Sequence, residues 1–193
     1  MAEKQTNKLV FLLPVAAFFL FAVIVTIALF GTLSGTRNTD QLPSVLIGKP
    51  APPLPITPLN DTLAKPLQEF QGRPVLINFM ASWCAPCRAE LPALALLGKE
   101  VDVIAIAYKD KNQDTEAFLQ TYGNPYDAVW MDYDGVVGRS FGLYGVPETF
   151  LLDGDGKIVM RHAGPVFKDV ISDVIRPALA ALGPARTDKA NAK

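Results

Sequence analysis

The chain has 193 residues, of which 50% are hydrophobic and 19% are charged, and its formal net charge is −1 at pH 7. This length suits one ordinary domain with appendages, and the apolar share is large enough to build a core. The charge balance shows no basic excess, which argues against nucleic acid as a partner.

The N-terminal segment is dominated by an apolar run. No residue from Leu9 to Phe30 is charged. At helical rise this run would span roughly 30 Å of hydrocarbon, so we predict a transmembrane signal anchor at residues 9–30. Lys4 and Lys8 precede the run, and the positive-inside rule then places residues 1–8 in the cytoplasm and the rest of the chain outside.

A cleavable signal peptide is the alternative for this segment. Its apolar core is typically shorter and ends at a small-x-small site, which Thr32-Leu33-Ser34 matches poorly. In either case the domain would fold in the periplasm or an equivalent exterior, where free thiols do not persist unless they are kept reduced.

Residues 31–44 are rich in Gly, Ser, Thr, Asn and Asp and predict a flexible linker. The folded domain is expected at residues 45–183. Its first part, residues 45–55, contains too many prolines for a helix or a central strand, so we expect an extended segment along the domain. Residues 56–59 and 63–67, separated by Asn60-Asp61, predict a small hairpin at an edge.

The chain's only two cysteines lie in the stretch Trp83-Cys84-Ala85-Pro86-Cys87. An apolar strand, residues 75–80, precedes this stretch, and a helical pattern follows it. Unpaired N–H groups and the helix dipole favour a thiolate at a helix start, which predicts Cys84 as the nucleophile. Cys87, one turn later, would resolve a mixed disulfide formed at Cys84.

Two other readings of the cysteine pair are weaker. A structural zinc site needs four ligands, and beyond the cysteines the chain offers only His162 and scattered carboxylates. A purely structural disulfide would close a very short loop and add little stability. A redox-active dithiol is therefore the preferred interpretation.

The remaining chain alternates strands and helices. Pro92 should kink the dithiol helix without ending it, and the next strand should pair in parallel with residues 75–80. The aspartates of the late turn are interpreted as turn formers rather than calcium ligands. In order, we expect strand 101–107, helix 112–122, strand 128–131, helix 136–141, a loop at 142–147, a hairpin of strands 148–152 and 157–162, helix 167–182, and a flexible tail at 184–193.

This α/β pattern, with the dithiol at a strand-to-helix turn and Gly145-Val146-Pro147 before a strand, resembles the thioredoxin fold over about residues 45–182. The resemblance implies a mixed central sheet flanked by helices. It also implies that Pro147 is cis and lies against the dithiol, and that Val146 offers its backbone to an extended substrate. An ordinary turn proline is the alternative.

Within this fold, the chain is similar to the membrane-anchored periplasmic thioredoxin-like proteins of cytochrome c maturation, the CcmG/DsbE type. The similarity rests on the N-terminal anchor, on the residues Gly-Val-Pro-Glu at 145–148, on Cys-Arg-Ala-Glu at 87–90, and on the helix at 112–122, which resembles an insert of that family. At Asn78 the chain departs from thioredoxin, which has a buried acid for proton transfer there. The proton acceptor is thus left open.

The resemblance brings Glu90 and Glu148 near the dithiol. A carboxylate beside a thiol disfavours the thiolate, and a less stable reduced form makes a better reductant. The plainer alternatives are a solvated helix residue for Glu90 and a charge at a strand edge for Glu148.

Further residues are assigned to the surface around the dithiol. Trp83 and Pro86 are expected to contact substrate together with Val146 and Pro147, and Tyr144 is a weaker candidate for the same groove. His162 is interpreted as a strand-surface residue rather than a catalytic base.

The resemblance implies a membrane-tethered protein-disulfide reductase in the bacterial inner membrane, with its catalytic domain in the periplasm. The expected substrates are the disulfides of apocytochrome c or of a maturation protein. A membrane thiol electron transporter would re-reduce the Cys84–Cys87 disulfide, and no prosthetic group is expected.

Two alternatives remain. One is a general periplasmic thiol reductase of the ResA/TlpA type, and another is a non-enzymatic docking or chaperone module that uses the fold as a binding surface. A peroxidase is disfavoured because Ala81 stands where peroxiredoxins carry threonine, three residues before the reactive cysteine.

Overall fold

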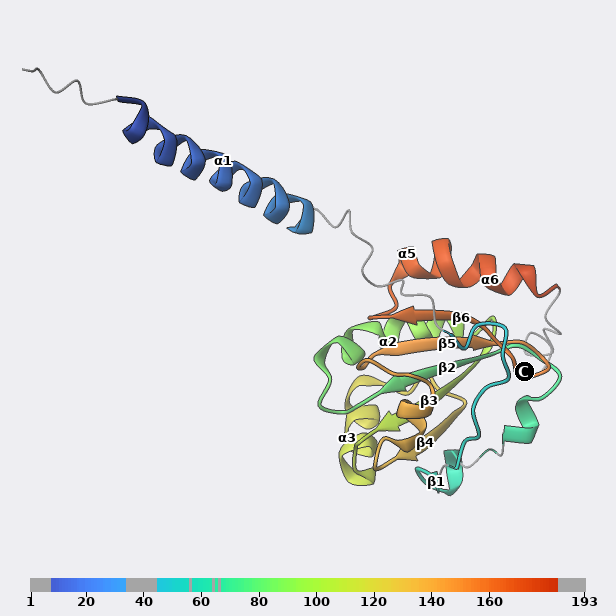
Figure 1. Cartoon of the computed structure of the whole chain (residues 1–193). Helices are drawn as coiled ribbons and strands as arrows, with labels where there is room; N and C mark the ends of the chain where they lie inside the picture. The colour runs from blue at the N-terminus through green and yellow to red at the C-terminus, as the bar shows by residue number, and fades with distance from the viewer. Residues whose placement is uncertain (1–7, 34–44, 56, 64, 66, 184–193) are drawn as a thin grey trace, which may run out of the picture. The chain divides into compact units, whose positions relative to one another are not determined.

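The computed structural model describes residues 8–33, 45–55, 57–63, 65 and 67–183 (Figure 1). The chain divides into two compact units, residues 1–39 and 40–193. The predicted tail at 184–193 and most of the predicted linker at 31–44 lie outside the described residues.

The first unit is the helix α1, Lys8–Leu33, which contains Pro14 in its first half. The side chains of α1 are described for residues 13–28, and large apolar side chains among them are exposed, including Phe18, Phe19 and Phe21. The described part of the chain holds no helix that is both long enough and apolar enough to cross a membrane. The predicted span at residues 9–30 therefore stays a prediction.

The second unit is built on one mixed sheet of six strands in the order β1-β4-β3-β2-β5-β6 (Figure 1). β2 pairs in parallel with β3, as predicted, and β3 pairs in parallel with β4. β5, β6 and β1 are antiparallel to their neighbours. The strands are β1 Thr57–Pro58, β2 Val75–Met80, β3 Asp102–Tyr108, β4 Ala128–Asp132, β5 Glu148–Leu152 and β6 Ile158–Ala163.

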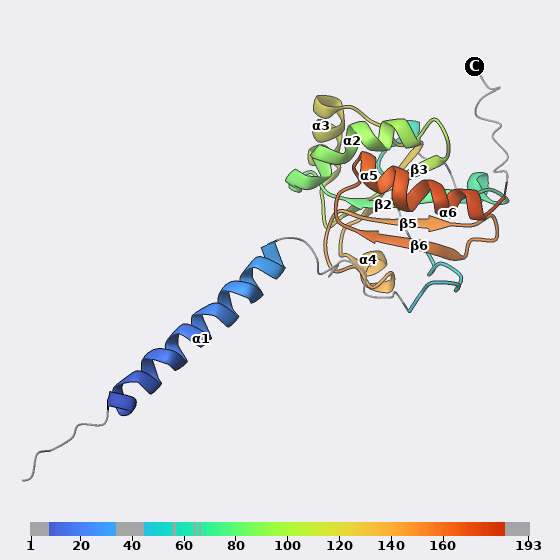
Figure 2. The same cartoon turned by 90° about the horizontal axis from the view of Figure 1, so that it is seen from above.

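Helices cover both faces of the sheet, which is why every residue of β2 is buried. One face packs against α2 (Ala85–Leu97), α3 (Asn112–Tyr122) and the C-terminal helix. Figure 2 shows α2 beside that C-terminal helix. The other face packs against α4 (Val136–Ser140) and against Leu46, Ala51 and Leu54 of the N-terminal segment. This arrangement is the predicted thioredoxin-like α/β architecture.

The helices agree closely with their predicted ranges. α2 continues through Pro92, and Gly98 caps its C-terminal end. The predicted final helix is continuous but changes its winding, because a π-helical segment, η3 (Ile171–Ile175), separates α5 (Lys168–Val170) from α6 (Arg176–Ala181).

The predicted hairpin at residues 56–67 is wrong. β1 pairs with β4, and two 3₁₀ turns follow it where the second strand was expected, η1 (Asp61–Leu63) and η2 (Leu67–Phe70); residues 56, 64 and 66 of the predicted hairpin lie outside the described residues. The reason is local, because the Leu63 N–H donates to both the backbone and the side-chain oxygen of Asn60, each at 3.2 Å. Asn60 thereby starts a 3₁₀ turn where a hairpin would need a second strand.

Two expectations for the late hairpin and the N-terminal segment are confirmed. The Oδ1 atom of Asp153 accepts the N–H groups of Asp155 at 3.0 Å and Lys157 at 2.8 Å, so Asp153 forms the turn. The extended segment lies along β6, where the Gly48 N–H donates to the Ile158 carbonyl oxygen at 2.7 Å.

Candidate active site

The two cysteines lie where β2 ends and α2 begins, as predicted, and they form a disulfide. Cys84 is the N-cap of α2, and its sulfur accepts the Cys87 backbone N–H at 3.1 Å. This N–H is one of the donors that a helix start leaves without a backbone partner. The same donor would stabilise a Cys84 thiolate after reduction of the disulfide.

The burial of the two sulfurs differs in the direction that their predicted roles require. Cys84 is 4% exposed and Cys87 is fully buried, at 0%. Both belong to the core cluster between α2 and the sheet. In the reduced protein a substrate disulfide would therefore reach Cys84 but not Cys87. The buried Cys87 would then attack the Cys84 sulfur of the mixed disulfide.

The loop before β5 lies against the dithiol. The peptide bond between Val146 and Pro147 is cis, and the carbonyl oxygen of Val146 lies 3.5 Å from the Cys84 sulfur. Pro147 is buried and Val146 is half-buried. The structure thus brings Val146 and Pro147 to the dithiol, as the resemblance implies.

The other residues predicted at the surface of the site are accessible. Trp83 is 61% exposed, and Ala85 and Pro86 are exposed beside it. Tyr144 is 72% exposed on the loop that carries Val146. His162 pairs with Thr149 across β5 and β6, and its Nε2 lies 3.4 Å from the Pro165 carbonyl oxygen. Its position on β6 is that of a strand residue, as interpreted from the sequence.

Glu90 is fully buried on α2, three residues after Cys87, so the two side chains share one face of the helix. Its Oε1 accepts the Asn78 side-chain amide at 3.0 Å, and its Oε2 accepts the Val166 backbone N–H at 2.9 Å. Burial raises the pKa of Glu90 to about 7, although both hydrogen bonds lower it. A carboxyl group thus stands beside the Asn78 position, with a proton affinity suited to exchange near neutral pH.

The pKa of Glu90 makes a prediction about stability. Between the usual pKa near 4.5 and the folded pKa of about 7, the folded protein binds more protons than the unfolded chain, so stability should fall as the pH rises through this window. The free energy of unfolding should fall by roughly 3 kcal/mol across this window. Urea unfolding of the oxidised full-length protein at about pH 5 and about pH 8 measures it.

Glu90→Gln is the control, because glutamine keeps the shape of the side chain and does not titrate. We expect the variant to lack this component of the pH dependence. Equal losses in the wild type and the variant would show that Glu90 does not titrate in this range.

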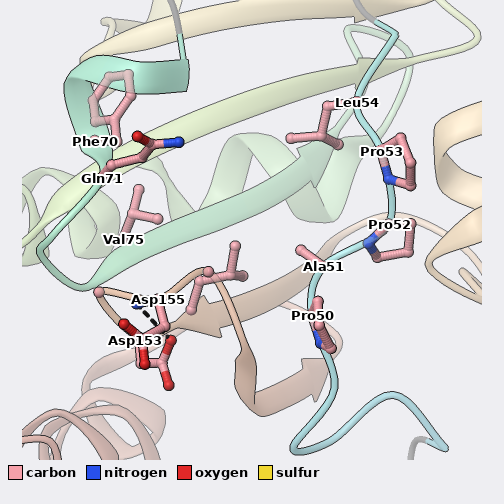
Figure 3. A pocket seen from close by; sticks show the side chains of 13 residues that line it. Pro50, Ala51, Pro52, Pro53, Leu54, Phe70, Gln71, Val75, Asp153 and Asp155 are labelled. Carbon is pink, nitrogen blue, oxygen red and sulfur yellow. Dashed lines mark hydrogen bonds between the residues drawn. The ribbon is translucent and has the colours of Figure 1, made fainter.

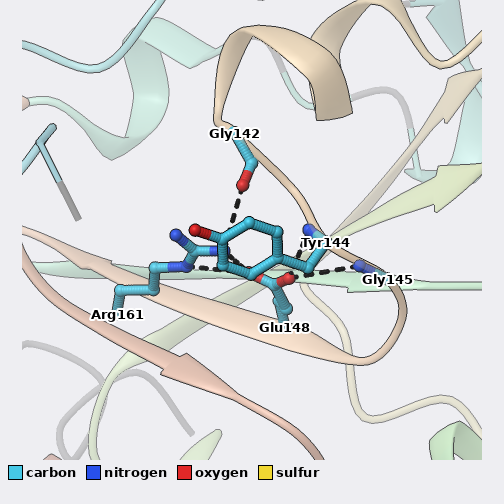
Figure 4. Close-up of polar contacts among 5 residues, drawn as sticks. All are labelled: Gly142, Tyr144, Gly145, Glu148 and Arg161. Atoms are coloured by element: carbon cyan, nitrogen blue, oxygen red, sulfur yellow. Dashed lines mark hydrogen bonds and ion pairs between the residues drawn. The ribbon is translucent and has the colours of Figure 1, made fainter. Parts of the chain in front are cut away.

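Glu148 holds the loop before β5 (Figure 4). Its Oε1 accepts the N–H groups of Tyr144 at 2.7 Å and Gly145 at 3.3 Å. Its Oε2 binds Arg161, at 2.8 Å from Nε and 2.7 Å from Nη2. Both side chains of this ion pair are buried, with 2% and 8% exposed. The carboxylate is therefore neutralised by a cation and fixes the backbone just before Val146.

Arg161 extends this clamp. It reaches from β6 to the same loop, where its Nη2 donates to the Gly142 carbonyl oxygen at 3.0 Å. Its guanidinium also lies over the Tyr144 ring, 4.5 Å from the centroid. One buried cation thus joins β6 to two points of the loop that faces Cys84, Gly142 and Tyr144, and to Glu148 at the start of β5.

Asp110 holds the other side of the dithiol. Its carboxylate accepts the backbone N–H of Ser82 at 2.6 Å and the Ser82 hydroxyl at 2.8 Å. The residue before it, Lys109, has a left-handed backbone (φ 49°), which is strained for a residue with a Cβ atom, and its carbonyl oxygen accepts the Trp83 indole N–H at 3.4 Å. The loop after β3 therefore fixes the two residues that precede Cys84.

Sequence reasoning missed Arg161, Asp110 and Tyr126, the last of which donates to Asn78 at 2.9 Å. Each acts from a distant part of the chain, and none lies in a recognisable motif. Glu90, by contrast, was predicted, and its spacing of three residues from Cys87 places both on one face of α2.

A pocket of about 390 Å³ lies elsewhere on the domain (Figure 3). It opens between residues 50–54, Phe70 and the turn at 153–156, and it includes Val75, the first residue of β2. Cys84 follows the other end of β2, roughly 16 Å away along the strand. The pocket is therefore no part of the dithiol site. Among the described residues no cluster of side chains could hold a metal ion.

Comparisons with known proteins agree with this geometry. The Redoxin family matches residues 46–174. The chain is 38% identical over 182 residues to the thiol:disulfide interchange protein DsbE of Yersinia pestis, covering 91% of this chain and 94% of that protein. It is 39% identical over 146 residues to the thiol:disulfide interchange protein HelX of Rhodobacter capsulatus, covering 75% and 83%.

A solved structure gives the same picture. The crystal structure of a DsbE-type thiol:disulfide interchange protein from Chlorobium tepidum is similar to this chain with a TM-score of 0.59 and 30% sequence identity. The similarity covers 69% of this chain and 96% of that one. Sequence and structure thus point to the same group of proteins.

Proposed function

Because the chain belongs to the Redoxin family and, within it, to the DsbE-type thiol:disulfide interchange proteins, we propose that it reduces protein disulfides in cytochrome c maturation. The observation that carries the proposal is the Cys84–Cys87 disulfide at the start of α2, with Cys84 4% exposed, Cys87 fully buried, and Glu90 one turn further along the same helix face. Exchange of disulfides is the chemistry that this arrangement serves.

The reaction begins with the reduced dithiol. The Cys84 thiolate attacks one sulfur of a substrate disulfide, which forms a mixed disulfide and releases the second substrate sulfur as a thiolate that takes up a proton. Cys87 then loses its proton and attacks Cys84. The Cys84–Cys87 bond forms, the mixed disulfide breaks, and the first substrate sulfur leaves as a thiolate. Two electrons pass from the dithiol to the substrate.

Glu90 supplies the proton acceptor for the second step. It is a buried carboxyl on the same helix face as Cys87, and its pKa of about 7 lets it accept a proton near neutral pH. In its charged form it also disfavours a thiolate beside it, which destabilises the reduced dithiol and favours electron donation to substrates. The second effect favours reduction of substrates, whereas the first speeds exchange in either direction.

Substrate docking is proposed at the loop before β5. Val146 presents its backbone beside Cys84, so an extended peptide can pair with it as with a sheet edge. Exposed Trp83, Pro86 and Tyr144 would contact the same peptide. Glu148 acts here as a positioning residue through the loop that it fixes.

The proposed substrate is apocytochrome c, whose haem-attachment motif C-x-x-C-H forms a disulfide when oxidised, or a maturation protein that binds it. A membrane thiol electron transporter would return the dithiol to its reduced form. These partners suit a domain outside the cytoplasm, where disulfides form readily.

A membrane anchor completes the proposal. It rests on the uncharged run from Leu9 to Phe30 and on the lysines that precede it. The exposed apolar side chains of α1 are of the kind that a lipid environment would cover. The protein would then be a single-pass protein of the bacterial inner membrane with its dithiol domain in the periplasm.

The test is an exchange assay with the reduced full-length protein and an oxidised peptide that carries a C-x-x-C-H motif. We expect the peptide to be reduced at least about tenfold faster than a peptide with the same two cysteines and a scrambled sequence around them. Equal rates would favour a general thiol reductase of the ResA/TlpA type. Cytochrome c maturation supported by a Cys84→Ser, Cys87→Ser double variant would instead favour the chaperone module.

A further inference from the structure

Glu90 is the end of a chain of buried hydrogen bonds that begins outside α2. The Tyr126 hydroxyl, in the loop between α3 and β4, donates to the Asn78 Oδ1 atom at 2.9 Å. The Asn78 amide nitrogen then donates to Glu90 Oε1 at 3.0 Å and to Thr149 Oγ1 at 3.1 Å. Asn78, Glu90 and Thr149 are fully buried and Tyr126 is 6% exposed, so water does not replace a lost partner.

The Asn78 amide has two possible orientations, and they suit different forms of Glu90. In the observed orientation its N–H group faces Glu90, which suits a carboxylate acceptor. In the reversed orientation its oxygen would face Glu90, which requires a protonated carboxyl. The amide orientation therefore controls how readily Glu90 gives up its proton.

Tyr126 favours the observed orientation. A phenol proton needs an acceptor when it is buried, and the Asn78 oxygen provides one only in this orientation. Burial and the nearby Glu90 raise the pKa of Tyr126 well above 10, so the phenol keeps its proton and remains a donor. Reversal of the amide would leave that proton without an acceptor.

We propose that Tyr126 is a positioning residue for disulfide exchange, which locks the Asn78 amide toward Glu90 and so keeps this carboxyl able to take up and release a proton beside Cys87. The inference rests on the proposed function of Glu90 as the proton acceptor. It assigns a role to a residue far from the dithiol in the chain.

The groups that face Glu90 come from each element packed around it. Asn78 lies on β2, the Val166 N–H follows β6, Tyr126 precedes β4, and Cys87 lies on α2 itself. Of these, Tyr126 and the cysteines are ionisable, and the cysteines do not titrate in the oxidised protein. In the oxidised protein the cysteines therefore add no titration step beside Glu90, while His162 lies on β6 opposite Thr149 and is told apart by following the Glu90 carboxyl itself.

The experiment is a carbon-13 NMR titration of the Glu90 carboxyl in oxidised full-length protein, wild type and Tyr126→Phe. We expect the variant to raise the titration midpoint by about one pH unit, a tenfold change in proton affinity, because the freed amide turns its oxygen toward Glu90. The pH profile of mixed-disulfide resolution in reduced protein should move upward with it. Tyr122→Phe, at an exposed tyrosine on α3, is the matched control and should move neither.

An unchanged midpoint would overturn the inference, even if the variant were less stable, since a merely structural tyrosine lowers stability without moving the titration. A midpoint that rises while the resolution profile stays fixed would also overturn it. Reduction of the C-x-x-C-H peptide by the wild type is measured separately. A failure of the proposed function is therefore distinguished from a failure of the role of Tyr126.

A measurement on the wild type covers the case in which Tyr126→Phe does not fold. We expect the Asn78 side-chain amide protons to show nuclear Overhauser contacts to Glu90 and Thr149 on both sides of the Glu90 midpoint. Amide protons that turn toward the Tyr126 ring when Glu90 becomes protonated would show that Tyr126 does not lock the amide.

Discussion

A Cys87→Ser variant is expected to stop after the first step of exchange, joined to its substrate through Cys84. Cys84 remains accessible and keeps its N-cap position, so it still attacks a substrate disulfide, but the buried hydroxyl at position 87 cannot break the mixed disulfide. Turnover should fall by roughly a thousandfold or more. The complex is measured on non-reducing gels and by mass spectrometry after incubation with the oxidised C-x-x-C-H peptide.

Cys84→Ser is the matched control for this prediction. It removes the accessible sulfur and leaves the buried one, so neither turnover nor a covalent complex is expected. A complex in Cys84→Ser and none in Cys87→Ser would reverse the assigned roles of the two cysteines.

Arg161→Met should lower the stability of the domain strongly. It leaves the buried Glu148 carboxylate without its cation and removes the contacts to Gly142 and Tyr144. Loss of one partner of a buried ion pair typically costs about 3–5 kcal/mol. Urea unfolding measures this loss, and slower exchange is expected with it because the loop that carries Val146 loosens.

Two comparisons make this prediction specific. A Glu148→Gln, Arg161→Met double variant removes both charges and should recover much of the stability that Arg161→Met loses. Arg176→Met breaks an ion pair with Glu100 in which both side chains are exposed, and it should change stability little. Similar losses in Arg161→Met and Arg176→Met would contradict the proposed importance of burial.

The parts of the fold that the sequence predicts are those with strong local patterns. β2 is an apolar run broken only by Asn78, and α3 has a polar start with Gly123 and Pro125 after it, so their observed bounds equal the predicted ones. The predicted hairpin at 56–67 is wrong because Asn60 starts a 3₁₀ turn and because β1 pairs with β4, more than seventy residues later in the chain, a partner that no local pattern indicates.

The residues of the site also fall into two groups, those predicted from local motifs and those placed by distant parts of the chain. The dithiol, Val146 and Pro147 lie in motifs whose residue types carry the chemistry, and the structure brings them together. Arg161 and Asp110 bind backbone groups of loops that only the folded chain places beside them. Such charge-to-backbone contacts have no sequence signature, because any carboxylate or guanidinium at that place in the fold could make them.

The surroundings of Asn78 could be interpreted only with the structure. The sequence marks it as a departure from thioredoxin and leaves the proton acceptor open. The fold places Glu90 against it at 3.0 Å, so a carboxyl from α2 occupies the surroundings where thioredoxin has its acid.

The reduction potential of the Cys84–Cys87 pair tests the central claim most directly. Equilibration of the full-length protein with glutathione buffers measures it. The account predicts a potential well below the roughly −120 mV of a strong oxidant such as DsbA, and nearer to the roughly −270 mV of thioredoxin. A value at or above about −120 mV would show that the dithiol accepts electrons from its substrates, and would contradict a reductive function.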